Sequence, residues 1–301
     1  MKKAIIVTAY HKVEMLNIFL TQLLEDAETD IYIHVDKKSN ITKDIISDPR
    51  IIHAEKQYEI NWGSDELLKA ILSLYRQIIR SGIEYKYVIV TTGQDLVVRK
   101  GLDAFLLEHD GQVFIDSMYS EEMDRYKRAV LMHKWPEIYK KNYSTKYHPV
   151  RVARSLRISL LFKLGNHFEK KVNYDVDKIK FYYDRHWNAM PIEVVKWIID
   201  YIDSNPEYWK IFDGAFMCEE AFFTTTIMMG PYADRIKLED NKSTSLTFRK
   251  KSSDNNHPAV LSFEDIHEIE ASGCFFARKF DLSVDSKVID YFVNQKAGSS
   301  Y

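Results

Sequence analysis

Two adjacent carboxylates, Glu219 and Glu220, stand just before a run of apolar and hydroxyl residues that begins with Phe222 and Phe223. A carboxyl group beside a second one and next to aromatic rings can have a raised pKa and act as a general base. The alternative is structural, because the segment EEAFFTTTIMM predicts a helix over 219–229, and acidic residues at a helix start complement its dipole. The residues alone leave both interpretations open.

A second pair of chemically unusual neighbours is Arg278 and Lys279, which lie inside the aromatic segment FFARKFD at 275–281. Cations that are removed from water need an anionic partner, such as a phosphate or a carboxylate. The segment therefore predicts either an anion-binding site or a buried ion pair.

The elements that must position these residues alternate between strands and helices in the first third of the chain. Apolar runs predict strands, and apolar residues at helical spacing predict helices. The predicted strands are 4–8, 31–36, 50–55, 86–92 and 112–117, and the predicted helices are 15–24 and 67–79, with Gly82 ending the second one. Later helices are predicted at 191–202, 262–272 (with Ser262 as the N-cap) and 283–295. This order predicts an α/β fold whose mostly parallel sheet carries helices on both faces.

Sheets of this kind bind ligands at the carboxyl ends of their strands. His34, Val35 and Asp36 follow one predicted strand, and Asp95 follows another. Asp36 could accept from a ribose hydroxyl or a base edge, or it could cap the next turn, whereas His34 within a strand is more typical of the core. Because no GxGxxG and no GxxxxGK[ST] motif occurs, a Rossmann dinucleotide site and a P-loop are not predicted.

Metal chemistry has little support in the sequence. The one D-x-D pair, Asp175 and Asp177, lies in a polar segment and is expected to be solvated, and HExxH and CxxC motifs are missing. Two cysteines among 301 residues suit a reducing compartment, and the net charge of −2 gives no general attraction for nucleic acid. Neither a signal peptide nor a transmembrane run is predicted, so we expect a cytoplasmic protein.

The charge is nevertheless unevenly distributed. Residues 124–171 contain 13 Lys or Arg and three acids, which is a local net charge of +10. Within this segment, Val152, Leu156, Leu160 and Leu164 are spaced four apart among basic residues. Such a helix could lie on an anionic membrane surface, or it could pack on the core with a solvated basic face.

Six fragments, in order across nearly the whole chain, resemble motifs of one family, glycosyltransferase family 14. This family comprises the core-2/I-branching β-1,6-N-acetylglucosaminyltransferases and the protein O-xylosyltransferases. The fragments are IYIHVDKKS (31–39), NWGSDELLKAILSLYR (61–76), VIVTTGQDLVV (88–98), HWNAMPIEVVKWI (186–198), CEEAFFTTTI (218–227) and FFARKFD (275–281).

The resemblance implies a GT-A type fold and an inverting transferase that uses a nucleotide-diphosphate sugar without a metal or another cofactor. By its match to the family, Glu220 is the expected general base, and Lys279, together with Arg278, is expected to stabilise the leaving diphosphate. The uridine end is expected at His34, Val35 and Asp36. The sugar site is expected at Asp95, Trp187 and Glu219.

The resemblance also implies one catalytic domain over 1–301, with a nucleotide-sugar half (1–117) and an acceptor and catalytic half (118–301). UDP-N-acetylglucosamine is the expected donor, and UDP-xylose or another UDP-sugar is the alternative. The expected acceptor is a saccharide of cell-surface polysaccharide or glycan synthesis. If this saccharide is linked to a lipid, the protein is expected on the inner face of the cell membrane. A non-catalytic saccharide-binding or membrane-binding module and a nucleotide-sugar hydrolase remain alternatives.

Two departures from the family pattern concern the site itself. Cys218 and Glu219 stand where the family has Pro and Asp before the base. A second diphosphate-binding Arg is missing from the matching stretch at 244–248, where Lys242 or Arg249 could replace it.

Overall fold

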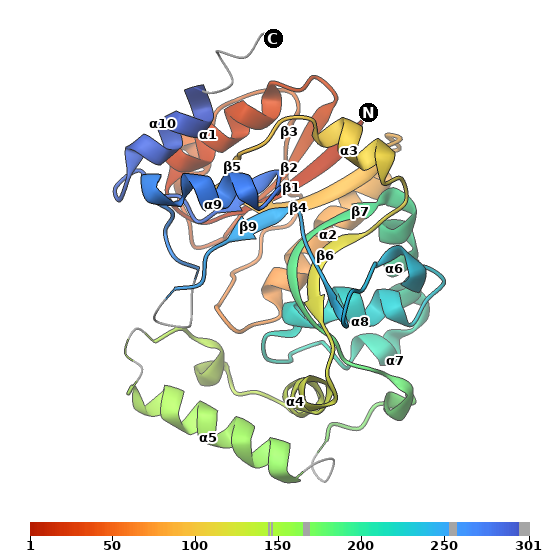
Figure 1. Cartoon of the computed structure of the whole chain (residues 1–301). Helices are drawn as coiled ribbons and strands as arrows, with labels where there is room; N and C mark the ends of the chain where they lie inside the picture. Colours follow the sequence, from red (N-terminus) through yellow and green to blue (C-terminus); the bar gives the residue numbers. More distant parts are fainter. Residues whose placement is uncertain (144, 146, 165–168, 253–257, 295–301) are drawn as a thin grey trace.

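The computed structural model describes residues 1–143, 145, 147–164, 169–252 and 258–294. Within these ranges, seven strands form the main sheet, in the order β3-β2-β1-β4-β7-β6-β8 (Figure 1). The strands are β1 (Lys3–Ala9), β2 (Thr29–Val35), β3 (Ile51–His53), β4 (Tyr87–Thr92), β6 (Phe114–Met118), β7 (Tyr183–Pro191) and β8 (Lys242–Ser243). The first four are parallel to one another, whereas β7 pairs antiparallel with β4 and β6, and β8 pairs antiparallel with β6. The predicted α/β fold with a mostly parallel sheet is therefore confirmed.

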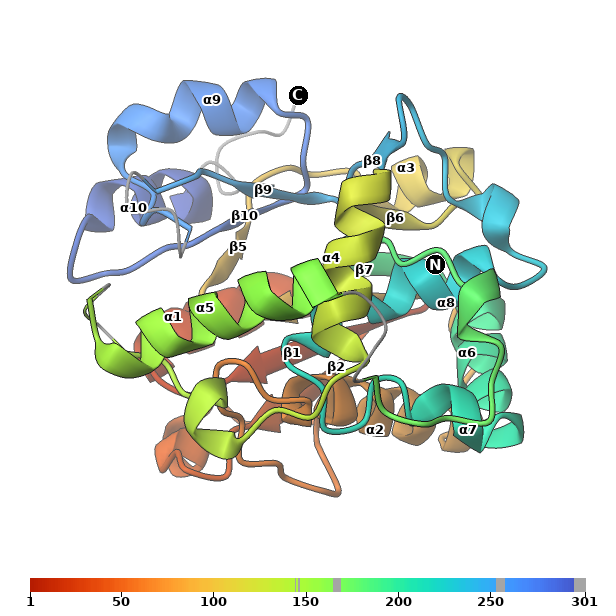
Figure 2. The ribbon, with the colours of Figure 1, turned by 90° about the horizontal axis from the view of Figure 1, so that it is seen from below.

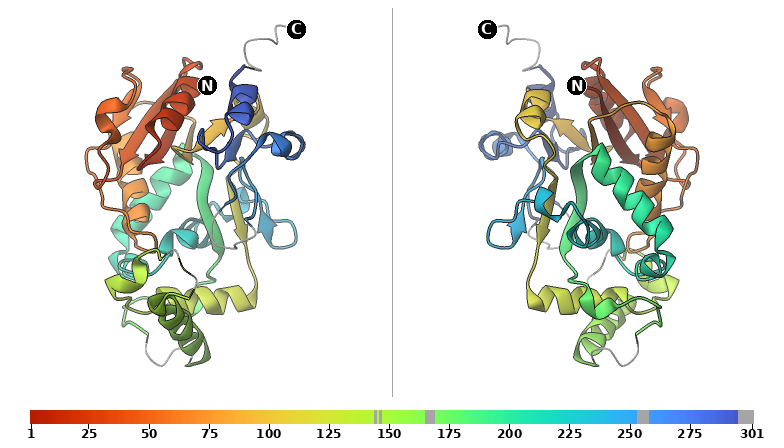
Figure 3. Two further views of the ribbon diagram at one scale, coloured as in Figure 1. Left: turned by 90° about the vertical axis from the view of Figure 1, so that its left-hand side faces the viewer. Right: turned by 90° about the vertical axis from the view of Figure 1, so that its right-hand side faces the viewer.

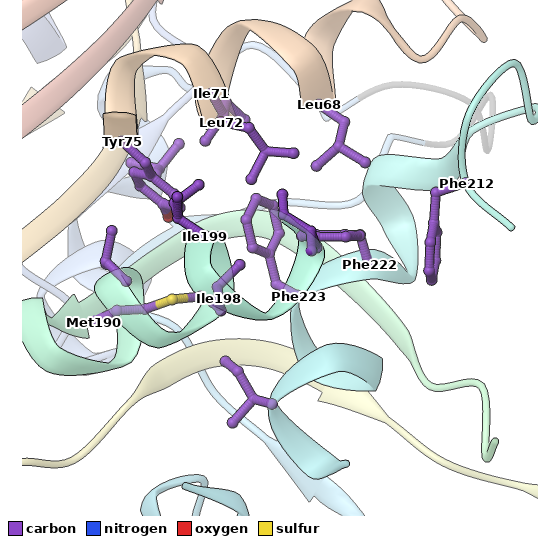
Figure 4. Packing of buried hydrophobic residues seen from close by; sticks show 14 of the residues in the cluster. Leu68, Ile71, Leu72, Tyr75, Met190, Ile198, Ile199, Phe212, Phe222 and Phe223 are labelled. Carbon is purple, nitrogen blue, oxygen red and sulfur yellow. The ribbon is translucent and has the colours of Figure 1, made fainter. Parts of the chain in front are cut away.

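Alternate side chains of the central strands face two separate cores. Ala4 and Ile6 of β1 pack with one cluster, and Ile5 and Val7 pack with the other. The first cluster is covered by α2 (Glu66–Arg80), α6 (Ile192–Ser204) and α8 (Phe222–Met228), whose aliphatic and aromatic side chains interlock in Figure 4. The second is covered by α1 (Val13–Leu24), α3 (Leu102–Glu108), α9 (Ile266–Ala271) and α10 (Ser286–Asn294). Helices thus cover both faces of the sheet, as predicted.

Local signals placed most helix boundaries well. The helix α2 begins one residue before the predicted range, and Gly82 adopts a φ of 67° just after it, which suits a glycine beyond a helix end. Ser262 and Asp265 form the capping box at the 3₁₀ turn that leads into α9.

The helix predicted over 219–229 starts later than expected. Glu219 and Glu220 lie in a separate 3₁₀ turn (Cys218–Glu220), and α8 begins only at Phe222. The break occurs because Ala221 takes a φ of −149°, outside the helical region. Neither carboxylate therefore belongs to the first turn of α8.

A second, three-stranded sheet lies against the first and consists of β5 (Asp95–Val97), β9 (Thr247–Arg249) and β10 (Phe276–Arg278). Its central strand, β10, pairs antiparallel with β5 and parallel with β9. This register places Asp95, Arg278 and Arg249 in one row across the sheet. Three residues from distant parts of the sequence are brought together in this way.

The basic segment forms a layer of its own at one end of the molecule. It contains α4 (Glu121–Leu131) and α5 (Pro149–Leu164), which lie below the two sheets in Figures 1 and 3. Seen from below, α5 is nearest to the viewer (Figure 2). A small aromatic cluster that includes Trp135, Leu161 and Phe216 joins this layer to the rest of the protein. The predicted basic helix is therefore present, as α5.

Candidate active site

The ends of three neighbouring parallel strands form one edge of the main sheet, as predicted. The amide of Asp36, after β2, donates to the carbonyl of Ala9 at 2.8 Å. The amide of Gly93, after β4, donates to the carbonyl of Thr8 at 2.9 Å. The loops after β1, β2 and β4 therefore open on the same side.

The three residues expected at the uridine end lie at this edge and are buried. Nε2 of His34 accepts from the amide of Tyr58 at 2.9 Å, and burial lowers the pKa of the imidazole. The carboxylate of Asp36 accepts from the amides of Lys38 (2.9 Å) and Ile60 (3.3 Å), while Val35 is buried in the core. Asp36 thus caps its own turn and also holds the segment around Ile60.

The row across the small sheet carries two buried guanidinium groups over one indole ring. Cζ of Arg278 lies 4.3 Å and Cζ of Arg249 lies 4.8 Å from the ring centroid of Trp187. Asp95 is fully buried, lies 3.4 Å from Nε of Arg278 and accepts from the Thr92 hydroxyl at 2.6 Å. Asp95 is therefore positioned to hold Arg278 in place.

Arg249 has a different carboxylate partner, Asp116 in the middle of β6. The same carboxylate lies 3.6 Å from Nη1 of Arg185. Burial lowers the pKa of Arg249 to about 10, and its Nε has no hydrogen-bond partner among the described residues. One carboxylate thus faces two guanidinium groups, which leaves this part of the site rich in positive charge.

His186 and Lys279 lie beside these arginines, and Lys279 adds to the positive charge. Burial, together with Arg278 and Arg249, lowers the pKa of His186 to about 3, so the imidazole is neutral at physiological pH. Lys279 is half-buried, and its pKa is lowered by burial and then by Arg278. Lys12, after β1, lies close enough to lower it further, while Asp281 opposes this effect. An anion would be stabilised here, because it would offset the mutual repulsion of these cations.

The two glutamates differ in their surroundings. Glu219 is buried, one of its oxygens has no partner among the described residues, and burial followed by Glu220 raises its pKa to about 8. The Glu220 side chain is 25% exposed and accepts from Nζ of Lys127 at 3.2 Å, whereas the Lys127 side chain is 3% exposed. Asp184, fully buried, accepts from the amide of Thr224 at 2.7 Å, and burial raises its pKa to about 7. Glu220 is the glutamate that solvent and a ligand can reach.

A single strand, β7, connects the glutamate region with the arginine region. Its first residues, Tyr183 and Asp184, adjoin Lys127 and the turn that bears the glutamates. Further along, His186 and Trp187 adjoin the two arginines. Arg185 lies between the two regions, 3.6 Å from Asp116. Burial opposes its charge, but Tyr183, Asp116 and Glu220 together raise its pKa. Strand β7 thus links the turn that bears the expected base with the expected diphosphate-binding residue Arg278.

Other residues considered from the sequence lie elsewhere or are solvated. Lys242 is exposed on the edge strand β8, away from the row of Asp95, Arg278 and Arg249. Asp175 and Asp177 are exposed and pair with Lys178 and Arg128, as expected for a solvated D-x-D. No group of three His, Cys, Asp or Glu side chains within the described ranges is arranged as a metal site.

Several residues of the site were not identified from the sequence. They are Asp116, Lys127, Asp184 and Arg185. A signal was present for three of them, since Asp116 lies in a predicted apolar strand and DRHW interrupts an otherwise β-like segment with charges. Lys127 had no such signal, because it is one of many cations in the basic segment.

Comparisons with known proteins agree with the motif analysis. A sequence model described as "Branch: Core-2/I-Branching enzyme" matches residues 5–270. No protein with curated annotation matches the chain significantly. One similar solved structure is that of TarS from S. aureus, whose sequence is 21% identical. The match covers 38% of this chain and 21% of TarS, and its TM-score is 0.30. The chain thus spans about a fifth of the length of TarS.

Two further solved structures resemble larger parts of the chain. Mouse xyloside xylosyltransferase 1 has 11% identity, with 77% of this chain and 82% of that chain covered and a TM-score of 0.33. UDP-glucose pyrophosphorylase of Leishmania major has 8% identity, with 87% and 71% covered and a TM-score of 0.32. These structural similarities are distant, so the assignment depends on the sequence model, which covers most of the chain. The chain belongs to the Core-2/I-branching enzyme family of glycosyltransferases.

Proposed function

We propose that this protein is an inverting, metal-independent glycosyltransferase that moves N-acetylglucosamine from UDP-N-acetylglucosamine to a hydroxyl of a saccharide. The observation that carries the proposal is the paired arrangement of Arg249 and Arg278 over Trp187, joined through β7 to Glu220. In the reaction, the acceptor oxygen bonds to the anomeric carbon and the bond from that carbon to the UDP oxygen breaks. The acceptor proton passes to a carboxylate, and UDP leaves with the electron pair of the broken bond.

The leaving UDP needs positive charge, which fixed cations can supply in place of a divalent ion. Arg249, Arg278 and Lys279 are the cations we assign to this task. Arg249 takes the place of the arginine that is missing from 244–248, because its register with Arg278 puts both guanidinium groups at one ring. Lys242, the other candidate, is exposed on a different strand. Asp95 is then a positioning residue for Arg278 and does not contact the sugar.

Glu220 is the general base in this proposal. Lys127 pairs with Glu220 and fixes the position of its carboxylate. Glu219 has a pKa raised to about 8 and is therefore mostly protonated at neutral pH, so it is suited to donate a hydrogen bond. The two adjacent carboxyl groups thus have different surroundings and can serve different roles.

The acceptor and the location of the protein are also proposals. A lipid-linked saccharide, used while the protein lies on the inner face of the cell membrane, would account for the basic layer of α4 and α5. None of the helices in the described ranges combines the length and the hydropathy that a transmembrane span requires.

The test combines ligand binding with one substitution. UDP, UDP-N-acetylglucosamine, UDP-xylose and UDP-glucose are titrated in EDTA and again with Mn²⁺, and the shift in melting temperature is measured. We expect UDP-N-acetylglucosamine to stabilise the protein fully in EDTA, whereas a preference for UDP-xylose would identify the alternative donor. A shift that requires Mn²⁺ would contradict metal independence.

Glu220→Gln then separates an enzyme from a binding module and from a hydrolase. The variant should keep its affinity for UDP while sugar transfer falls by about 10²–10⁴-fold. Unchanged transfer would exclude Glu220 as the base, and no transfer by the unaltered protein to any acceptor would favour a binding module. Release of free sugar without acceptor would indicate a hydrolase.

A further inference from the structure

The exposed side of α5 carries an apolar stripe, which is unusual for a surface helix. Val152, Leu156, Leu160 and Leu164 form this stripe along the helix and are 44%, 66%, 55% and 36% exposed. The inner side packs Leu161 on the core and also buries Arg154, whose guanidinium group packs on Trp62 and Phe216 and donates to main-chain carbonyls. The helix is therefore packed on the core, and its exposed face includes the apolar stripe.

A cavity of about 460 Å³ opens beside this stripe and combines apolar and basic walls. Leu160 and Leu164 line it together with the basic residues His133, Lys134, Arg157 and Lys170. Among the described residues that line this cavity there is no carboxylate. Burial lowers the pKa of Lys170 to about 8, although Asp213 and Asp65 lie near enough to oppose this effect, so Lys134 and Arg157 supply most of the positive charge.

Two buried nitrogen atoms at this cavity lack partners within the described part of the chain. His133 is 4% exposed, and while its Nδ1 is bonded to the carbonyl of Ala129 at 2.8 Å, its Nε2 has no partner. Nε of Arg157 is likewise unpaired, although Nη2 of the same group donates to the carbonyl of Lys134 at 2.9 Å. Buried polar atoms are normally paired, so the unpaired Nε–H donor of Arg157 indicates an anionic ligand. Burial lowers the pKa of His133, and with Nδ1 donating to Ala129 its Nε2 is an acceptor that could take a hydrogen bond from a ligand hydroxyl.

We propose that α5 docks on an anionic lipid bilayer, with the leucine stripe entering the acyl boundary and the cavity holding the phosphate of one lipid headgroup. Apolar side chains beside lysines and arginines are the combination that amphipathic helices use at membrane interfaces. The local net charge of residues 124–171, +10, attracts the helix to negatively charged lipids.

Docking through α5 would bring the turn that bears Glu220 close to the membrane. Phe216, which contacts Arg154 of α5, precedes Glu220 by four residues in the same loop. A lipid-linked acceptor held in the bilayer would therefore approach the base from the side of α5. This last step rests on the proposed function, whereas the docking itself does not.

The test is co-flotation of the full chain with vesicles of phosphatidylcholine alone and with about 30% phosphatidylglycerol added. We expect binding only with the anionic lipid, lost at about 1 M salt where the Debye length falls to about 3 Å. Leu156→Ser/Leu160→Ser and Arg157→Gln should each weaken binding by about tenfold or more. Leu107→Ser, which changes a comparably exposed leucine (55%) on α3, is the matched control and should bind normally.

Four results would overturn the docking proposal. One is equal binding to neutral and anionic vesicles, and another is undiminished binding by the Leu156→Ser/Leu160→Ser variant. The third is a dimer in solution that the same variant converts to a monomer, because the stripe would then bind a second copy. Inorganic phosphate that binds at Arg157 while vesicles do not would likewise assign the cavity to a soluble anion.

UDP binding separates this proposal from the proposed function. The stripe variants should bind UDP as the unaltered protein does, since none of the changed residues lies near Arg249 or Arg278. Loss of vesicle binding with intact UDP binding therefore bears on docking alone. Vesicle binding without any UDP binding would contradict the transferase and leave the docking surface in place.

Discussion

Arg249 and Arg278 lie in register on adjacent parallel strands, and both guanidinium groups lie over the ring of Trp187. Two like charges in a buried position are unfavourable unless anions compensate them. Asp95 and Asp116 provide one carboxylate each, but Asp116 is shared with Arg185. The arrangement is therefore well suited to accept further negative charge from a diphosphate.

The first prediction concerns Arg249. Arg249→Gln should weaken UDP binding by about 10–100-fold, since a hydrogen bond to a charged group contributes about 1.5–3 kcal/mol. Isothermal titration calorimetry with UDP in EDTA measures the effect. Lys242→Gln is the matched control, because Lys242 is exposed on β8 and should leave the Kd unchanged. If Lys242→Gln weakened UDP binding and Arg249→Gln did not, Lys242 would be the residue that replaces the missing arginine.

The second prediction concerns the pair of Lys127 and Glu220. Nζ of Lys127 lies 3.2 Å from the Glu220 carboxylate and fixes its position, so Lys127→Met should lower kcat by about 10–100-fold while the Kd of UDP stays unchanged. Sugar-transfer kinetics and calorimetry with UDP measure the two quantities. Lys180→Met, at an exposed lysine, should leave both unchanged. A parallel loss of UDP binding and of thermal stability would mean that Lys127 only stabilises the fold.

The third prediction is a pH dependence of stability. Burial raises the pKa of Glu219 to about 8 and that of Asp184 to about 7, so the folded protein binds more protons than the unfolded chain between about pH 5 and those values. The free energy of unfolding should therefore fall as the pH rises through this range, by up to about 1.4 kcal/mol per pH unit for each group.

Urea unfolding at a series of pH values measures this slope. Glu219→Gln, which stays neutral at all pH values, should flatten the curve between about pH 5 and 8. Glu84→Gln, at an exposed position, should leave it unchanged. A Glu219→Gln variant with the original slope would show that Glu219 is ionised in the folded protein.

The fourth prediction concerns the contact between Gly63 and Phe216. A Cβ at Gly63 would lie 2.3 Å from the Phe216 ring, and the Gly63 backbone also bonds to Lys140 and Met217. Gly63→Ala should lower the free energy of unfolding by about 1–3 kcal/mol, because the ring must move. It should also lower transfer activity, since this loop leads to Glu220.

A double variant checks the proposed cause. Phe216→Leu removes the ring, so Gly63→Ala should be nearly neutral in that background, as a double-mutant cycle by urea unfolding would measure. If the two substitutions lowered the free energy of unfolding additively, the Phe216 ring would not be the cause of the loss in Gly63→Ala.

Local patterns in the chain were sufficient for the fold and for the family. Strand β1 and helix α2 followed from apolar periodicity, which depends only on neighbouring residues, and Gly82 marked the end of α2. The six motif fragments led to the same family that the sequence model of residues 5–270 identifies. Strand β7 was missed because its inward-facing polar residues, which form the site, hide the β pattern.

Which residues meet was decided by tertiary structure, since that depends on strand pairing and loop paths between distant segments. Lys127 pairs with Glu220 across 93 residues, and no local signal distinguishes it from the other basic residues nearby. The sequence offered Lys242 and Arg249 equally, and only the pairing of β9 with β10 places Arg249 beside Arg278. The periodicity of α5 revealed its leucine stripe, but only packing shows that Arg154 points inward and the leucines point outward. Periodicity identifies the faces of a helix, whereas the energetics of burial across the whole fold decide which face is covered.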